Sequence, residues 1–309
     1  MSEISLNQFL HGLKDHELST CILSLAKACR KVSRAIHNEI PNLSQVATTT
    51  NEFGDQQLGI DLFADQVLAD GLRASGVVAT GSSEEIPEEV AMGGKNLSVA
   101  WDPLDGSSVI GQNFSVGTIF GVWRSPTLLG VSGKDMVASG CAIYGPRTTL
   151  SIAVEGYPNS LAFRLKPDNT WVKTEDFQSI GSGKLFAPGN LRATEDNPGY
   201  KKLVEIWMRE QYQLRYTGAL VPDVNMLLVK GKGIFCNAGS PKAKAKLRLL
   251  YEVMPLAYLI EKAGGASSDG EKSIMEYKAD SLNQTVQVCL GNAEEVARFN
   301  KIVGTQYLS

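Results

Sequence analysis

The sequence predicts a layered fold of mixed helices and strands, α+β or α/β, arranged as two lobes. Both halves of the chain contain stretches with helical and with strand-like periodicity. With 309 residues, of which 43% are hydrophobic and 20% charged, the chain can bury a large core. No internal repeat or Gly/Ser-rich linker marks a boundary, so we place an N-terminal lobe at residues 1–185 and a C-terminal lobe at 186–309 from the change of pattern alone.

Each expected element has its own periodicity. Apolar residues at helical spacing predict one long or broken helix over 5–40, stopped by Pro41, and a second helix over 55–74 before Gly76. Short β-rich runs punctuated by Gly, Pro and Asn predict strands at 77–80, 97–101, 116–123, 141–144 and 148–154. In the second half we expect helices at 197–211, 255–263 and 293–302, with strands at 226–235 and 286–290.

The charge balance argues against a surface built for nucleic acid or membranes. Thirty Lys and Arg against 33 Asp and Glu give a net charge of −3, and no apolar run approaches the ~20 residues of a membrane helix. The three histidines, His11, His16 and His37, all lie near the N-terminus, so chemistry elsewhere must use carboxylates, metals or hydroxyls. Five scattered cysteines without a C-x-x-C pair indicate a reduced intracellular chain, cytoplasmic, or plastidic if a presequence has been removed.

The segment AWDPLDGSS follows an expected strand and brings two carboxylates into one tight turn. Asp102 and Asp105 are three residues apart, and the Pro and Gly beside them favour a turn. Such a turn can aim both carboxylates and the Leu104 carbonyl at one point, which suits a hard cation such as Mg²⁺ or Mn²⁺. The alternative is an ordinary Asp-Pro/Asp-Gly turn.

Further acids accompany this turn. Glu84 and Glu85 follow another expected strand, and Asp61 and Asp65 share one face of the second helix, either near a cation or as two solvated positions. Glu252 follows an apolar run directly before a helix, where an unpaired buried charge would be costly. A bound metal would remove that cost.

A basic segment in the second half has a period of two, which places its cations on one face of an extended chain. These cations are Lys242, Lys244, Lys246 and Arg248. Arg192 and Arg215 add further positive charge, with Asn190 and Tyr216 as neutral hydrogen-bonding groups. The segment predicts an anion site, or alternatively a solvated basic edge strand.

Metal-binding carboxylates in the first half and anion-binding cations in the second predict phosphate-ester chemistry on a small anionic substrate. Nucleic acid is disfavoured because aromatic residues do not alternate with the cations. ATP and dinucleotides are disfavoured because neither G-x-x-x-x-G-K-[ST] nor a strand-linked G-x-G-x-x-G occurs.

The motifs SEEIPE, DPLDGSS, NFSVGTIFGVW, FAPGNLRAT, RYTGALVPDVN and SPKAKAKLRLLYEVMPLAYLIEKAGG, spread over residues 51–292, resemble the fructose-1,6-/sedoheptulose-1,7-bisphosphatase family. DPLDGSS alone is shared with a wider superfamily of metal-dependent sugar and inositol phosphatases. The resemblance implies an α/β/α/β/α layered fold of the fructose-bisphosphatase type. It also implies hydrolysis of the 1-phosphate of sedoheptulose 1,7-bisphosphate, or of fructose 1,6-bisphosphate, or of both.

The resemblance assigns two or three Mg²⁺ ions, or Mn²⁺, to Glu84, Glu85, Asp102, the Leu104 carbonyl, Asp105 and Glu252. Asp65 and Glu85, with Asp61 and Ser107 beside them, would orient or deprotonate the attacking water. The backbone N–H groups of Gly106 and Ser107, with Ser108 next to them, would stabilise the phosphoryl oxygens.

The resemblance also assigns the substrate contacts and an assembly. Lys246 and Arg248 match residues that hold the sugar phosphate, and Arg192 is a further phosphate ligand. Asn190 and Tyr216 would contact the distal phosphate or the sugar. Arg215 would reach into a neighbouring subunit, which implies a homodimer or homotetramer.

One departure from the family pattern bears on the substrate. Where fructose bisphosphatases have a tyrosine after GIF, this chain has Cys236, a smaller lining that could admit a seven-carbon sugar. The closely spaced N-terminal cysteine pair of redox-regulated plastid forms is missing, so we do not expect that switch.

Two rival functions remain. A non-catalytic sugar-phosphate-binding protein is opposed by the complete set of carboxylates. An inositol or nucleotide phosphomonoesterase is opposed by KLRLLYE and RYTG.

Overall fold

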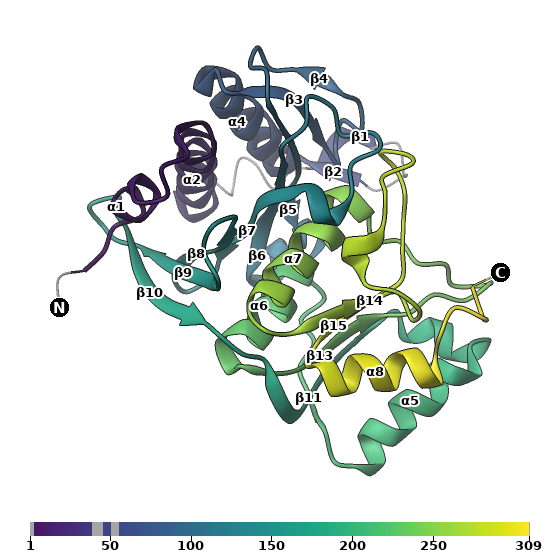
Figure 1. The fold of residues 1–309 in the computed structure, drawn as a ribbon. Coiled ribbons are helices and arrows are strands. Elements are labelled where there is room, and N and C mark those ends of the chain that lie inside the picture. The colour runs from purple at the N-terminus through teal and green to yellow at the C-terminus, as the bar shows by residue number, and fades with distance from the viewer. Residues whose placement is uncertain (1–2, 39–45, 51–55, 309) are drawn as a thin grey trace.

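A computed structural model describes residues 3–38, 46–50 and 56–308 (Figure 1). The helix stop predicted at Pro41 and the helix start predicted at residue 55 lie outside these ranges. Two sheets, of eight and five strands, organise the described residues, and a ribbon of β1 (Val46–Thr50) and β2 (Gln56–Leu58) lies apart from them. None of the described helices is long and apolar enough to cross a membrane.

The larger sheet has the strand order β10-β9-β8-β7-β6-β5-β3-β4. Its strands are β3 (Val78–Ser83), β4 (Val90–Ala91), β5 (Leu97–Asp105), β6 (Val116–Trp123), β7 (Met136–Tyr144), β8 (Thr148–Val154), β9 (Ser160–Leu165) and β10 (Trp171–Phe177). Only β3 and β5 are parallel, with Ser83 paired to Trp101. Parallel neighbours end at the same edge, so the acids that follow β3 lie beside those at the end of β5.

The smaller sheet has the order β12-β11-β13-β15-β14. Its strands are β11 (Gly181–Gly189), β12 (Gln213–Leu214), β13 (Lys232–Asn237), β14 (Ala266–Ser268) and β15 (Val288–Gly291). β11 is parallel to β12 and β13, whereas β15 is antiparallel to both of its neighbours.

Five layers alternate as α/β/α/β/α (Figure 1), which confirms the expected fold class. Helices α2 (His16–Asn38) and α4 (Gly59–Ser75) cover the outer face of the large sheet, and α5 (Pro198–Arg209) and α8 (Ala293–Ile302) cover that of the small sheet. Between the sheets lie α6 (Leu220–Lys230) and α7 (Met254–Lys262). α7 buries most of its residues because it packs against a sheet on each side.

Some predicted bounds match the structure and others do not. Strands β6 and β8 and helix α8 have the predicted bounds, while the first expected helix is broken into α1 (Leu6–His11) and α2. The strand predicted over 226–235 is correct only for residues 232–235, because α6 continues to Lys230 and β13 begins at Lys232. Its apolar residues fit both periods, and the left-handed Gly231 (φ 60°) ends the helix. Strands β1, β2, β4, β9 to β12 and β14 were not predicted. Residues 56–58 were expected to be helical but form β2, and α4 begins only at Gly59.

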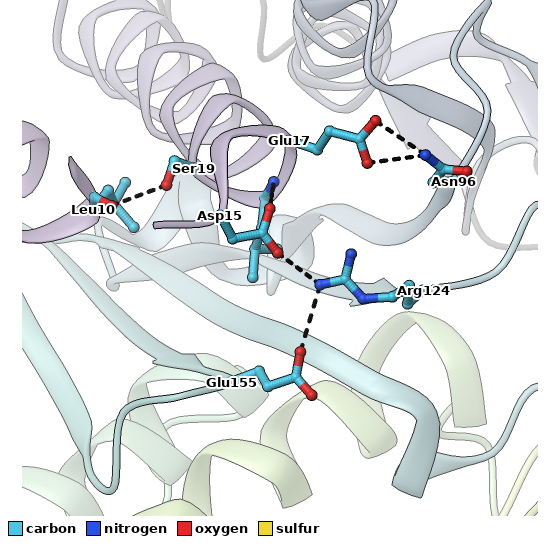
Figure 2. Close-up of polar contacts among 8 residues, drawn as sticks. Leu10, Asp15, Glu17, Ser19, Asn96, Arg124 and Glu155 are labelled. Carbon is cyan, nitrogen blue, oxygen red and sulfur yellow. Dashed lines mark hydrogen bonds and ion pairs between the residues drawn. The ribbon is translucent and has the colours of Figure 1, made fainter. Parts of the chain in front are cut away.

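The turn between α1 and α2 is tied to the large sheet by a polar network (Figure 2). One carboxylate oxygen of Asp15 accepts the Leu18 N–H at 2.9 Å and so caps α2. The other lies 2.7 Å from the Arg124 guanidinium, just after β6. Arg124 also lies 3.5 Å from the more exposed Glu155. Partial burial opposes ionisation of Asp15, but the Leu18 amide and Arg124 hold its pKa below the usual value.

We expect Asp15→Ala to lower the free energy of unfolding at pH 7 by about 1–2 kcal/mol, because the helix cap and part of an ion pair are lost. A carboxyl group whose pKa is lowered by folding stabilises the folded protein at pH values above its unfolded-state pKa. The difference in free energy of unfolding between wild type and Asp15→Ala should therefore shrink as the pH falls through the Asp15 pKa. Urea denaturation at neutral and acidic pH measures this. Glu155→Gln is the control and should change stability by less than about 0.5 kcal/mol. An Asp15→Ala protein as stable as wild type at pH 7 would refute the network.

Candidate active site

Three buried carboxylates meet where the end of β5 touches a single π-helical turn, η4 (Leu249–Val253). Oxygen atoms of Asp102, Asp105 and Glu252 all lie within 4.8 Å of one another. Their exposed fractions are 4%, 8% and 5%. Three converging oxygen ligands in a buried place can hold a hard divalent cation.

The turn at the end of β5 is built into the core and is not an isolated surface turn. The Leu104 N–H donates to Asp102 at 2.9 Å, and the Leu104 side chain is buried in the core beneath α2 and α4. Gly106 is left-handed (φ 82°), and a Cβ there would lie 2.4 Å from the Cβ of Ala219. The turn is therefore pressed against the start of α6, which requires glycine.

Asp105 is held by the N-terminus of α6. Its two carboxylate oxygens accept the Leu220 N–H at 3.0 Å and the Val221 N–H at 2.6 Å. Gly117 on β6 makes this close approach possible, since a Cβ there would lie 2.6 Å from a Val221 methyl group. The helix N-terminus favours negative charge, so it partly stabilises this buried carboxylate.

Glu252 comes from the second half of the chain. Its carboxylate accepts the Arg248 N–H at 2.6 Å across the π-turn. The Tyr251 hydroxyl lies 2.9 Å from the Ser82 hydroxyl on β3, which fixes η4 against the large sheet. Sequence alone predicted that this carboxylate is buried, and it is.

Glu84 and Glu85 follow β3 and surround the three carboxylates with more negative charge. The Glu84 N–H donates to the Trp101 carbonyl at 3.0 Å, which brings it beside the end of β5. The Arg248 guanidinium lies 3.1 Å from the Glu84 carboxylate. Within the described ranges, Arg248 faces these five carboxylates, which leaves an excess of negative charge.

Burial and mutual repulsion raise the pKa values of the three central carboxyls. Burial and then the charge of Glu84 raise the pKa of Asp102 and of Glu252 well above their usual values. Burial raises the pKa of Asp105 to about 7, although the Val221 and Leu220 amides oppose the shift. Carboxylates that repel one another in a buried site fit a metal ion, which would favour their charged forms.

Asp61 and Asp65 are buried, with 3% and 6% exposure, so their interpretation as solvated helix positions is wrong. Asp65 accepts the Trp101 indole N–H at 2.8 Å. Burial raises its pKa, while hydrogen bonds from Ser83 and Trp101 and the charge of Arg73 oppose that rise. Its two hydrogen-bond donors directly precede Glu84 and Asp102 in the chain, so Asp65 lies next to the carboxylate cluster.

Ser107 and Ser108 begin a short 3-10 turn, η1 (Ser107–Gln112), directly after the left-handed Gly106. The backbone N–H groups of Ser107 and Ser108 therefore follow the glycine turn directly. Ser108 is exposed and Ser107 is half-buried.

The predicted basic face divides into an outer and an inner part. Arg192, Lys242, Lys244 and Lys246 line one hollow, whereas Arg248 is buried and faces Glu84. Residues 241–247 belong to no sheet strand, so the interpretation as a basic edge strand is wrong.

The remaining predicted substrate residues lie nearby but differ in what they contact. The Asn190 amide donates to the carbonyls of Ala238 at 2.8 Å and Ala243 at 2.9 Å, so both of its N–H groups support the neighbouring loop. Arg215 and Tyr216 are exposed on the segment that precedes α6.

The sequence analysis missed Asp223, which lies in the first turn of α6 and is 1% exposed. Its carboxylate accepts the backbone N–H groups of Thr217 and Gly218, and so fixes the segment that carries Arg215 and Tyr216. An acid within the apolar stretch ALVPDVN could have revealed it, in the same way as Glu252.

Cys236 does not itself line an open pocket. Its side chain is 0% exposed and lies 3.7 Å from the buried Tyr200 hydroxyl. Any effect of this small residue on substrate size would act through Tyr200 and the packing around it. All five cysteines are free and buried.

A five-layered fold around a buried carboxylate centre is the arrangement of a metal-dependent phosphatase, and comparison with known proteins gives the family. The model "Fructose-1-6-bisphosphatase, N-terminal domain" matches residues 2–175, and "Fructose-1-6-bisphosphatase, C-terminal domain" matches 180–304. The chain belongs to the fructose-1,6-bisphosphatase family, which confirms the resemblance seen in its motifs.

Two curated relatives represent the two branches that the chain resembles. It is 47% identical over 301 residues to the chloroplastic sedoheptulose-1,7-bisphosphatase of Triticum aestivum, covering 96% of this chain and 76% of the relative. It is 35% identical over 297 residues to the class 1 fructose-1,6-bisphosphatase of Trichlorobacter lovleyi, covering 94% and 93%.

Solved structures agree with both. A Toxoplasma gondii protein provisionally named sedoheptulose-1,7-bisphosphatase superposes with a TM-score of 0.90 at 34% identity, covering 98% of this chain and 99% of that one. The holo form of Leishmania major fructose-1,6-bisphosphatase superposes with a TM-score of 0.89 at 26% identity, with the same coverage.

We expect Mg²⁺ to stabilise the protein more at pH 8 than at pH 5. A carboxyl group whose pKa is raised by folding contributes stability that is fully present below its unfolded-state pKa of ~4. This contribution is lost as the pH rises through the folded-state pKa, which is about 7 for Asp105. Metal-free protein therefore loses stability over this range, and a bound cation offsets the loss. The measurement is the melting temperature with Mg²⁺ minus that with EDTA.

In Glu252→Gln, the increase in melting temperature caused by Mg²⁺ at pH 8 should come closer to the increase at pH 5, because one charge that repels its neighbours and binds the ion is removed. The amide oxygen can still accept the Arg248 N–H, so the π-turn is kept. Asp280→Asn, at an exposed position, is the control. An equal effect of Mg²⁺ at both pH values would contradict the metal assignment.

Proposed function

We propose that the protein is a Mg²⁺-dependent bisphosphatase that converts sedoheptulose 1,7-bisphosphate to sedoheptulose 7-phosphate and phosphate. One observation carries the proposal: a buried cluster of mutually repelling carboxylates is joined through Arg248 to a cation-lined hollow. Sedoheptulose-1,7-bisphosphatases of wheat, spinach and Chlamydomonas reinhardtii are 46–47% identical to this chain, against 34–38% for the class 1 fructose-1,6-bisphosphatases compared with it. Fructose 1,6-bisphosphate, or both substrates, is the alternative.

The metal ligands in this proposal are Glu84, Glu85, Asp102, the Leu104 carbonyl, Asp105 and Glu252. When bound, Mg²⁺ neutralises charge on the phosphoryl oxygens and on the leaving group. The chain's own part is to hold these ligands together, through the α6 amides on Asp105 and the π-turn on Glu252. The number of ions, two or three, belongs to the proposal.

Asp65 accepts the proton of the attacking water in this proposal, with Glu85 and Asp61 beside it. Its raised pKa, caused first by burial, and its fixed hydrogen bond to Trp101 suit a positioned general base. The N–H groups of Gly106, Ser107 and Ser108 stabilise the developing charge on the phosphoryl oxygens.

The cations and neutral groups of the second half bind the substrate. We assign the sugar phosphate to Lys246 and Arg248. Arg192, Asn190 and Tyr216 lie towards the distal end of the substrate in this proposal. Asn190 acts through the loop that it supports, because both of its N–H groups are used there.

We also propose a homodimer or homotetramer and an intracellular location. The exposure of Arg215 supports the assembly, because the resemblance assigns this residue to a contact with a neighbouring subunit. The wheat, spinach and alga relatives are named as chloroplastic, and a plastid or the cytoplasm is consistent with five free cysteines.

We expect purified protein with Mg²⁺ to release phosphate from sedoheptulose 1,7-bisphosphate with a higher kcat/KM than from fructose 1,6-bisphosphate. Phosphate release from each substrate measures this directly. A higher kcat/KM for the six-carbon substrate would replace the main proposal by its alternative. If neither substrate released phosphate, the remaining interpretation would be a non-catalytic sugar-phosphate-binding protein.

Asp102→Asn should reduce kcat/KM by more than about 100-fold, because a buried metal ligand loses its charge. The amide oxygen can still accept the Leu104 N–H, so the melting temperature without metal should not fall. Asp105→Asn is a poorer test because both oxygens of Asp105 accept N–H groups. Asp280→Asn controls for the loss of one carboxylate, and full activity of Asp102→Asn would remove Asp102 from the metal site.

A further inference from the structure

A cavity of about 430 Å³ lies between α6 and the inner face of the large sheet, and we call it the α6 cavity. Its helical wall consists of residues that share one face of α6 at spacings of three and four, namely Pro222, Asn225, Met226 and Val229. Because α6 packs against β6, β7 and β13, the strands β8 to β10 beyond it form the opposite wall. The volume lies within the range of sites for small molecules.

The α6 cavity exists because the sheet presents short side chains there. Thr149 and Ser151 on β8 pair with Arg164 and Ala162 on β9, so these four side chains share one face of the sheet. The Ser151 hydroxyl donates to the Asn225 side-chain carbonyl at 3.1 Å and joins the sheet to the helix. Since Ser151 and Ala162 are short, space remains beside this contact.

The charged residues that line the α6 cavity are three cations and one acid, namely Arg147, Arg164, Lys230 and Glu175. In the part of the chain that the structure describes, none of the three cations forms a hydrogen bond or an ion pair through its side chain. The lining therefore carries an excess of positive charge, although the whole chain has a net charge of −3. Such a surface attracts an anion.

Other cations on the same strands do have carboxylate partners. The Lys173 ammonium on β10 lies 2.6 Å from the Asp176 carboxylate, and Lys166, directly after β9, lies 3.2 Å from Glu3. Arg164 is half-buried and, within the described ranges, lacks such a partner. Partial burial of an unpaired charge is unfavourable, and an anion in the α6 cavity would remove that cost.

Two arginines enter the α6 cavity from neighbouring strands. Arg147 directly precedes β8, and Thr149, two residues further on, is the cross-strand partner of Arg164. A guanidinium can bind two oxygens of a phosphate group at once. Met226 and Val229 add apolar surface on the helical wall, which suits a ligand with an apolar part.

We propose that the α6 cavity binds a small organic phosphate monoester with an apolar part. Three positive charges and one negative charge leave an excess of two, which matches the nearly two negative charges of such a group above its second pKa of ~6. This binding does not depend on the proposed bisphosphatase function. The cavity is separate from the carboxylate cluster but shares α6 with it, because the first N–H groups of that helix hold Asp105.

The test is isothermal titration calorimetry of the full-length protein with phenyl phosphate at pH 8, with EDTA present to remove metal. Arg147→Gln and Arg164→Gln should each raise the Kd of one binding site about tenfold, as expected for one lost charge-assisted hydrogen bond. Glu175→Gln should lower the same Kd severalfold, because it removes a repelling charge from the lining. A general loss of stability would not produce this opposite effect.

Three controls separate the α6 cavity from other anion sites. Lys202→Gln removes a positive charge from an exposed position on α5 and should leave the Kd unchanged. Lys246→Gln alters the hollow assigned to the substrate and should also leave this site unchanged. Benzoate has the same ring with a single charge and should bind more weakly than phenyl phosphate.

Four results would overturn the inference. The first is that no binding site responds to Arg147→Gln and Arg164→Gln. The second is an equal effect of Lys202→Gln, which would indicate only general attraction, and the third is benzoate binding as tightly as phenyl phosphate. The fourth is a changed sedimentation coefficient of Arg164→Gln with unchanged probe binding, which would make these cations a subunit contact.

Activity measurements keep this inference apart from the proposed function. Without the probe, Arg147→Gln and Arg164→Gln should keep kcat and KM for sedoheptulose 1,7-bisphosphate within about twofold of wild type, because neither residue belongs to the candidate active site. A larger loss of activity would place these arginines in the substrate site and contradict a separate cavity. Wild type that releases no phosphate but binds the probe in the α6 cavity would contradict only the proposed function.

Discussion

The mutual repulsion of carboxylates in a buried place is the constraint on which this structure depends. Asp102, Asp105 and Glu252 are each less than a tenth exposed and lie within 4.8 Å of one another. Such an arrangement is unfavourable unless the surroundings stabilise the charges. The protein does this with the amides at the start of α6, the backbone of the π-turn and the guanidinium of Arg248. A bound cation would complete that stabilisation.

The layer of helices between the two sheets joins the halves of the chain at this point. α6 presents its N-terminus to Asp105, and the π-turn that precedes α7 carries Glu252. Both helices contact both sheets, so the carboxylates of the first half and the residues of the second are held by one packed interior. The same layer bears Asp223, which fixes the segment before α6. The candidate site is therefore supported by the core around it.

Charge is separated along the path from the carboxylates to the surface. Arg248 contacts Glu84 at the inner end, and Lys246, Lys244 and Arg192 follow towards solvent. A net charge near zero thus conceals an acidic centre beside a basic hollow. This pattern suits a small molecule with two phosphates, because each end meets groups of suitable charge.

The sequence by itself identified the residue types of the candidate site and the bounds of several elements. DPLDG, the acids after β3 and the alternating lysines identified carboxylates and cations, since residue type and spacing are local properties. Periodicity located β6, β8 and α8 for the same reason. It failed for α6, whose apolar residues fit a helix and a strand alike, and for the short strands β12 and β14. Only the tertiary structure decided that Asp61 and Asp65 are buried, that Asp223 supports the site and that Arg248 turns inward while Lys244 faces solvent. These properties depend on which distant segments pack together, and no local pattern in the chain contains that information.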